Sequence, residues 1–375
     1  MKIIDISRSA KYKISNINKK KKGTIMNKLS KIIVSLMTSF ALSFSAFAGE
    51  LTVTGTAKAT YSTLSDMVTG DNTIGVANEL KFGANGELDN GWTWDYFIEL
   101  DPGSAAAGGN AINDDSSFAV TTPYGVAKFC SSECGLSAAG NFNANAYTWI
   151  TDTAYAEGKV EPVNISSYSN MQLHTPAGLL PFSTVIKAAY APSGSTIVNS
   201  SNASNTTKIA TLSNTTQYRV ETTPIDGLDI SASYTEQDGG DVSGATDEQQ
   251  SESGTIAAKY AFGSFTVGLG KSYVAPRIAD VTGSGDTTIE QYINTDVSIA
   301  FAVNDALSVS FSQEKSDKQF ATSATVAYEQ KTKSLQAAYT MGGMTLAVAR
   351  TDYDNVGYAS GITATENLFA VTMAF

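Results

Sequence analysis

Segments that alternate apolar and polar side chains repeat along most of the chain, and this feature constrains the fold more than any other. The last seven residues show it clearly, because Phe369, Val371, Met373 and Phe375 occupy every second position with smaller residues between them. The same alternation runs through 51–61, 92–99 and 228–235. Side chains of a β-strand point alternately to its two faces, so the pattern predicts strands with one apolar and one polar face.

The connections between these segments are of two kinds, and the two kinds alternate strictly along the chain. Short connections carry tight-turn residues, since Gly supplies a positive φ and Pro presets the first turn position. They are Asp89–Gly91, Thr122–Gly125, Thr175–Gly178, Pro224–Gly227, Gly263–Ser264, Asn304–Asp305 and Gly342–Gly343. Long polar connections lie near 62–77, 101–115, 130–163, 191–214, 237–251, 275–289, 315–327 and 354–365. Seven strand pairs around the short turns, with one strand before and one after them, predict sixteen strands.

This sorting of loop lengths favours a membrane barrel over a soluble β-sandwich. A barrel in a bacterial outer membrane has short periplasmic turns and long extracellular loops, whereas a sandwich has no reason to separate them. An even strand count also lets the first strand pair with the last, so that no strand edge is left open to lipid. We therefore expect an all-β fold, a 16-stranded antiparallel transmembrane β-barrel.

Aromatic residues form two bands at opposite ends of the predicted strands, as the girdles at the two membrane interfaces require. The band near the long loops consists of Tyr61, Tyr190, Tyr234, Tyr273 and Tyr353. The band near the short turns consists of Trp92, Trp94, Tyr260, Phe262, Phe265, Phe301, Tyr339 and Phe375. Ordinary enrichment of aromatics in strands would scatter them along each strand instead.

Residues 26–48 have the layout of a secretory signal peptide. Met26–Lys31 is positively charged, Ile32–Phe44 is apolar but too short to span a membrane, and Ala46–Ala48 is a small-residue cleavage site. We interpret residues 1–25 as an upstream extension outside the fold, with Met26 as the true start. A basic arm with its own function is the alternative. Residues 49–375 then form the mature domain.

Charge narrows the range of partners. Residues 49–375 carry 15 basic and 35 acidic residues, a net charge of −20. So acidic an exported chain is a poor ligand for nucleic acid, and a pore through it is expected to favour cations. Small hydrophilic solutes, outer-membrane lipid and lipopolysaccharide are the partners that such a barrel would meet.

Two cysteines, Cys130 and Cys134, lie close together in Cys-Ser-Ser-Glu-Cys. In an oxidising compartment they favour a disulfide over two free thiols. The sequence has no phosphate loop, dinucleotide fingerprint or zinc ligand set, so we expect no cofactor and no bound metal. Asp114–Asp115 and Asp238–Asp241 could hold a divalent cation that bridges lipopolysaccharide, or they are solvated turn residues.

Two other classes of function remain as alternatives to a channel. A barrel hydrolase needs a histidine beside a nucleophile or a carboxylate, and the sole His174 lies beside Pro176 at a predicted short turn. A non-conducting adhesin or receptor would use the long loops, among which 191–214 is rich in Ser, Asn and Thr. A hydrolase is disfavoured, so we expect no enzyme.

The chain resembles the Gram-negative general diffusion porins over most of 49–375. The resemblance rests on the sixteen-strand pattern, on the ending Phe369–Phe375, and on Ser167–Ser169 and Thr175–Gly178 leading into Ile186–Pro192. It implies passive diffusion of small hydrophilic solutes through a water-filled pore, a homotrimer, and a third long loop folded into the barrel. A substrate-specific outer-membrane channel is the closest alternative function.

The resemblance also implies a pore constriction in which loop carboxylates face basic residues on the wall. The third long loop, near 130–163, is the longest of the eight and supplies Glu133, Asp152, Glu157 and Glu161. The basic candidates with lumen parity are Lys58, Lys81, Lys128, Lys187 and Arg219. The dense arginine cluster of the family is missing, because four of these five residues are lysines.

The C-terminal residues have two expected roles. As the sixteenth strand they should close the ring against 51–61. Phe369, Val371, Met373 and Phe375 also resemble the assembly signal that the barrel assembly machinery reads in outer-membrane proteins.

Overall fold

The computed structural model describes residues 51–65, 72–102, 111–131, 134–150, 165–192, 214–238, 250–276, 289–320 and 327–375. The predicted signal peptide and upstream extension lie outside these residues and stay predictions. No helix among the described residues is long and apolar enough to cross a membrane.

Sixteen strands account for most of the described residues. They are β1 (Leu51–Ser65), β2 (Asn72–Glu87), β3 (Thr93–Pro102), β4 (Ala111–Thr122), β5 (Gly125–Ser131), β6 (Asn170–His174), β7 (Val185–Ala191), β8 (Asn214–Ile225), β9 (Leu228–Asp238), β10 (Ser251–Phe262), β11 (Phe265–Ala275), β12 (Ile289–Ala302), β13 (Leu307–Phe320), β14 (Gln330–Met341), β15 (Met344–Asp354) and β16 (Thr363–Ala374). The short 3-10 turns are η1 (Ala139–Phe142), η3 (Ile165–Ser167), η4 (Pro181–Ser183) and η5 (Val356–Tyr358).

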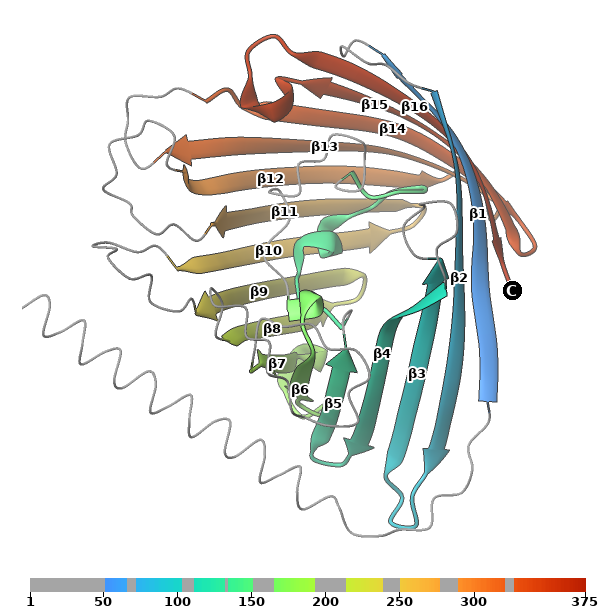
Figure 1. Ribbon diagram of the computed structural model, residues 1–375, viewed down its shortest axis with the longest axis vertical. Helices are drawn as coiled ribbons and strands as arrows, with labels where there is room; N and C mark the ends of the chain where they lie inside the picture. Colours follow the sequence, from blue (N-terminus) through green and yellow to red (C-terminus); the bar gives the residue numbers. More distant parts are fainter. Residues whose placement is uncertain are drawn as a thin grey trace, which may run out of the picture. The chain divides into compact units, whose positions relative to one another are not determined.

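These strands form one closed antiparallel barrel in which each strand pairs with its neighbours in sequence (Figure 1). The ring closes between β1 and β16, with Tyr61 opposite Phe369 and Thr56 opposite Ala374. Beyond the last ladder pair, Gly55 and Phe375 exchange two backbone hydrogen bonds of 2.8 and 3.0 Å. The predicted strand count and the predicted closure by the C-terminal strand are confirmed.

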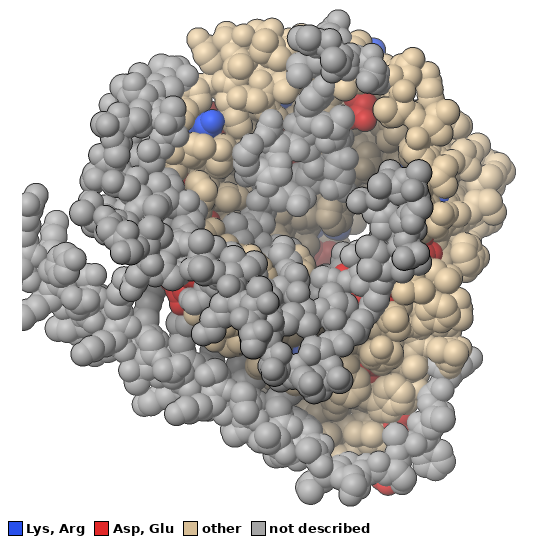
Figure 2. Space-filling view, viewed as in Figure 1, with Lys and Arg blue, Asp and Glu red and all other residues tan. Residues whose placement is uncertain are grey.

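The two faces of the barrel differ in polarity, as the alternation in the sequence predicts. Buried Ser, Thr and Gln side chains follow the inner face, for example Ser231, Ser233 and Thr235 on β9. Large apolar side chains such as Leu269 and Leu335 are exposed on the outer face. Figure 2 shows a described surface on which few charged side chains appear. An apolar outer face around a polar interior is the arrangement of an outer-membrane barrel.

Several strands extend further than the sequence predicts. β1 continues to Ser65 and β13 to Phe320, so the loops expected at 62–77 and 315–327 are shorter than predicted. Most residues there are polar whichever face they occupy, but the backbone ladder continues through pairs such as Ser62–Leu368 and Lys315–Lys331. Backbone pairing needs no apolar side chain, which is why the pattern ends before the strand does.

The predicted strict separation of short and long connections is wrong between β6 and β7. This connection runs from 175 to 184 and contains η4, so it is longer than the connection 355–362 between β15 and β16. Pro176 and Pro181 lie within it. Proline lacks the N–H that a strand ladder needs, and this explains why the strands end early here.

The aromatic band near the short turns is continuous over part of the outer face. Tyr260, Phe262, Phe265 and Phe301 follow one another with ring centroids 5.4, 5.8 and 4.7 Å apart. At the opposite end, the prediction for Tyr353 is wrong: its side chain is 1% exposed and donates a 2.8 Å hydrogen bond to Glu366. On β15 it shares the buried parity of Ala347, Ala349 and Thr351, so it points into the barrel.

Candidate functional site: the barrel interior

The connection between β5 and β6 begins with a segment, 134–150, that lies against the inner wall of the barrel. Figure 1 shows the part of it that carries η1 crossing strands β9 to β11. The segment contains no Asp, Glu, Lys or Arg. Its own backbone N–H groups therefore make most of its polar contacts with the wall.

Side chains on successive strands of the wall accept hydrogen bonds from these N–H groups in order along the segment. The N–H of Leu136 donates to Gln217 on β8 at 3.0 Å, and that of Ala138 donates to Ser233 on β9 at 2.8 Å. Further along, the N–H of Ala144 donates to Ser298 on β12 at 2.9 Å. A loop segment that belongs to no strand ladder must satisfy its buried backbone groups in some other way, and here the inner face of the barrel does so.

The far end of the segment is held by Ser310 on β13 and Gln336 on β14. The N–H of Ala146 donates to Ser310 at 2.8 Å. The Oε1 of Gln336 accepts from Tyr147 and Thr148, each at 3.1 Å, while its Nε2 donates to the Thr148 carbonyl at 2.9 Å. One side chain thus satisfies three backbone groups of the segment.

Small wall residues allow this close approach at β11. A Cβ at Gly268 would collide with the Phe142 carbonyl, and a Cβ at Gly270 would lie 2.8 Å from the Phe142 ring. The Oγ of Ser298 donates to that same carbonyl at 2.7 Å. Phe142 is 1% exposed and packs with Ile150 and Ala257. The two glycines therefore leave room for the apolar side chain of Phe142 against an otherwise polar wall.

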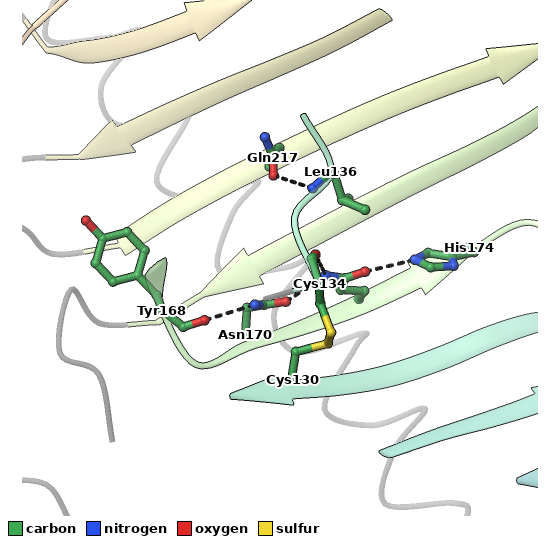
Figure 3. Close-up of a disulfide and its surroundings, with 8 residues drawn as sticks. Cys130, Cys134, Leu136, Tyr168, Asn170, His174 and Gln217 are labelled. Carbon is green, nitrogen blue, oxygen red and sulfur yellow. Dashed lines mark hydrogen bonds between the residues drawn. A yellow bond between two sulfur atoms is a disulfide. The ribbon is translucent and has the colours of Figure 1, made fainter. Parts of the chain in front are cut away.

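A disulfide between Cys130 and Cys134 ties the start of the segment to the end of β5 (Figure 3). The Cys134 carbonyl accepts a 2.6 Å hydrogen bond from the Nε2 of Gln172 on β6. The Oε1 of Gln172 lies 3.0 Å from the Nε2 of His174, the residue singled out for a hydrolase. His174 therefore contacts an amide on its own strand, and no nucleophile is among its described hydrogen-bond partners.

The five basic candidates all share the parity of the inner face. Lys187 and Arg219 lie opposite each other on β7 and β8, and both pair with Glu221, at 2.6 and 3.0 Å. The Nη1 of Arg219 also donates to the Ser137 carbonyl of the loop segment at 2.7 Å. This corner of the wall therefore contacts the loop directly.

The other three lysines approach aromatic rings. The Nζ of Lys81 lies 3.5 Å from Glu99 and 3.7 Å from the centroid of the Phe97 ring, and the Nζ of Lys128 lies 5.9 Å from the same centroid. The Nζ of Lys58 on β1 lies 5.3 Å from the centroid of the Tyr147 ring. Ammonium groups are attracted to the face of such rings. Arg219 on β8 therefore contacts the segment near its start, at Ser137. Lys58 on β1 approaches it near its far end, at Tyr147.

The four predicted carboxylates, Glu133, Asp152, Glu157 and Glu161, lie outside the described residues. The wall partners Glu221, Glu99 and Phe97 were not predicted as site residues, nor were Gln217 and Gln336. For Glu99 and Glu221, the available signal was an inward-facing carboxylate opposite Lys81 and two residues from Arg219. Within the described parts of the chain, no three His, Cys, Asp or Glu side chains gather where they could hold a metal ion.

Comparison with known proteins matches the chain to one family and to solved structures that share its barrel fold. A family model described as Gram-negative porin matches residues 34–374. No curated protein matches the sequence.

Solved structures match the whole barrel at low identity. The anion-selective porin from Comamonas acidovorans is 14% identical with a TM-score of 0.61, covering 87% of this chain and 100% of that one. OmpF of Salmonella typhi, solved with daunomycin, is 12% identical with a TM-score of 0.61, covering 88% and 100%. A loop L8 deletion mutant of OmpT from Vibrio cholerae is 14% identical with a TM-score of 0.60, covering 88% and 100%. At these identities the likeness concerns the fold.

Proposed function

Because the chain belongs to the Gram-negative porin family, we propose that it forms a water-filled channel through which small hydrophilic solutes and ions diffuse across the outer membrane. The observation that carries this proposal is the polar inner wall of a closed barrel, with a loop segment bonded along it. No chemical step is needed, since selectivity follows from the pore diameter and the charges that line it.

The segment 134–150 and the residues that follow it would form the constriction. Its path from Gln217 on β8 to Gln336 on β14 takes it along the inner wall, inside the barrel. The carboxylates Glu133, Asp152, Glu157 and Glu161 would then face Lys58, Lys81, Lys128, Lys187 and Arg219 across the pore.

The expected preference for cations depends on how many wall cations are already neutralised. Lys187 and Arg219 share Glu221, and Lys81 lies beside Glu99. Paired charges contribute little net field to the lumen, so the acidic balance of the mature chain would dominate. The reversal potential under a salt gradient tests this preference: clear anion selectivity would contradict it.

The channel would work as a homotrimer in lipid and lipopolysaccharide, delivered by the barrel assembly machinery. A trimeric form of OmpT from Vibrio cholerae is among the structures that this fold matches. The mass of the detergent-solubilised protein, measured by light scattering, would distinguish a trimer from a monomer.

Osmotic swelling of liposomes tests the diffusion of solutes most simply. Liposomes that contain the protein purified from outer membranes should swell in a small sugar alcohol and should not swell in dextran. Swelling in neither solute, with correctly folded protein inserted, would favour a non-conducting adhesin or receptor.

A further inference from the structure

A polar cavity of about 490 Å³ lies inside the barrel between the loop segment and strands β8 to β10. The loop contributes Gly140, Asn141, Asn143 and Trp149, and the wall contributes Glu221, Asp229 and Lys259 among others. Asp229 and Lys259 lie close to the tight turns that follow β8 and β10, so the cavity is on the short-turn side of the loop. Its volume falls within the range of small-molecule sites.

Trp149 gives this cavity a flat aromatic surface in a fixed place. A Cβ at Gly140 would lie 2.8 Å from the indole ring, so one part of the ring packs directly on the glycine backbone. The side chain is nevertheless 48% exposed. An aromatic side chain held on one side and open on the other, within a polar cavity, can stack with a ligand.

The loop also supplies amides beside the ring. The Nδ2 of Asn143 donates to the Gly140 carbonyl at 3.2 Å, and its Oδ1 accepts from Asn145 at 3.2 Å. These contacts fix the turn on which Trp149 packs. Among the described residues, no hydrogen bond engages the side chain of Asn141, which therefore keeps donors and an acceptor for a ligand.

The facing wall presents both hydrogen-bond acceptors and a donor. Asp229 accepts from the Oγ1 of Thr223 at 2.9 Å, which leaves further lone pairs on the carboxylate. Lys259 lies directly opposite Asp229 in the ladder between β9 and β10. Glu221 is already paired with Lys187 and Arg219, so the charges around the cavity are largely balanced.

We propose that this cavity is a binding subsite for a neutral pyranose sugar, with Trp149 as the stacking platform and Asn141, Asp229 and Lys259 as partners of its hydroxyl groups. A pyranose has an apolar face that covers an indole, and each of its hydroxyls both donates and accepts a hydrogen bond. An inorganic ion has no such face. A strongly anionic ligand would meet the Asp229 and Glu221 carboxylates. The subsite rests on the proposed channel function, since the sugar reaches the lumen through the pore.

The test compares glucose with sorbitol, which has a similar size and similar hydroxyl groups but no ring face. Single channels of the purified protein are recorded in salt alone and then with increasing concentrations of each solute. Glucose should lower the current along a saturating curve, and sorbitol should lower it only in proportion to solution viscosity. The Trp149→Ala variant should weaken the apparent glucose affinity at least tenfold, whereas Trp149→Phe should retain most of it. Equal and linear effects of both solutes, or a glucose effect unchanged in Trp149→Ala, would overturn the subsite.

A second readout separates this inference from the proposed channel function. Glucose should change the tryptophan fluorescence of the folded wild-type protein, and this change should be absent in Trp149→Ala, which keeps Trp92 and Trp94. Channels that conduct in salt but show no saturable glucose effect would refute the subsite alone. Protein that neither conducts nor shows the fluorescence change would refute the channel and, with it, the route by which glucose reaches the subsite.

Discussion

At the scale of single residues, two glutamines of the inner wall each satisfy more than one backbone group of the connection between β5 and β6. Gln217 accepts from the N–H groups of Leu136 and Ile165, at 3.0 and 3.3 Å, and Gln336 serves three groups at the other end. Both side chains are buried. A buried N–H without a partner costs about 1–3 kcal/mol, so such residues determine whether the segment stays on the wall.

Replacement of Gln336 by Leu should release the far end of the segment. Two N–H groups and one carbonyl lose their partner, and at 1.4 kcal/mol per factor of ten the released state should become roughly tenfold or more populated. Single-channel recording should show a noisier open current while the barrel remains folded. The control is Gln319→Leu, because Gln319 bonds Gln291 at an exposed position away from the segment. A quiet current in Gln336→Leu would contradict the anchoring role.

Glu221 controls the charge of the wall beside the loop. The Glu221→Gln variant removes the partner of Lys187 and Arg219 and should free both cations to attract anions. The ratio of cation to anion permeability should fall by roughly twofold or more at low salt, where screening is weak. Reversal potentials would measure it. The control is Glu236→Gln. Glu236 alternates with the inward-facing Ser233 and Thr235 on β9 and so lies on the outer face, and its replacement should leave the ratio unchanged.

At the scale of the strand, β16 joins the two ends of the ring. Phe375, the residue that follows it, pairs with Gly55 on β1 through two backbone hydrogen bonds. A Cβ at Gly55 would lie 2.7 Å from the Glu79 carbonyl oxygen on β2 and 2.8 Å from the Phe375 ring, so the glycine leaves room for both. The aromatic end of the chain and the glycine of β1 therefore fit as a pair.

Deletion of Phe375 should impair assembly more than conduction. The deletion removes one pair of backbone hydrogen bonds and the residue that resembles the end of an assembly signal. The amount of folded protein in the outer membrane should fall severalfold, while any channels that form should have the wild-type conductance. Phe375→Ala, which removes the ring but keeps the backbone hydrogen bonds to Gly55, separates the two effects. Normal membrane levels of the truncated protein would refute the signal role.

The pairing of strands could be predicted from the sequence where apolar and polar side chains alternate along a whole strand. Phe369–Phe375 and 51–61 alternate cleanly, and their pairing is found as predicted. Tyr353 lies near the long-loop end of β15, which favours a girdle position, but its parity is that of the inner face. Leu346 and Val348 mark the outer face of β15, and Tyr353 has the opposite parity. The signal was present in the sequence.

At the scale of the whole molecule, the interior could be predicted only in part. Side-chain parity placed Lys58, Lys81, Lys128, Lys187 and Arg219 on the inner face, where the structure has them. The path of 134–150 was beyond reach, because it depends on bonds between residues as distant in sequence as Tyr147 and Gln336. Such contacts leave no periodic trace, since a serine or glutamine on the inner face looks the same whether it meets water or a loop.

The central claim is that a continuous water-filled path runs through the barrel, and single-channel recording in a planar bilayer tests it most directly. Purified protein added to a bilayer in potassium chloride should produce discrete current steps that vary linearly with voltage. Steps that group in threes would in addition support a trimer. A bilayer that stays silent, although the inserted protein keeps the electrophoretic mobility of a folded barrel, would contradict the account.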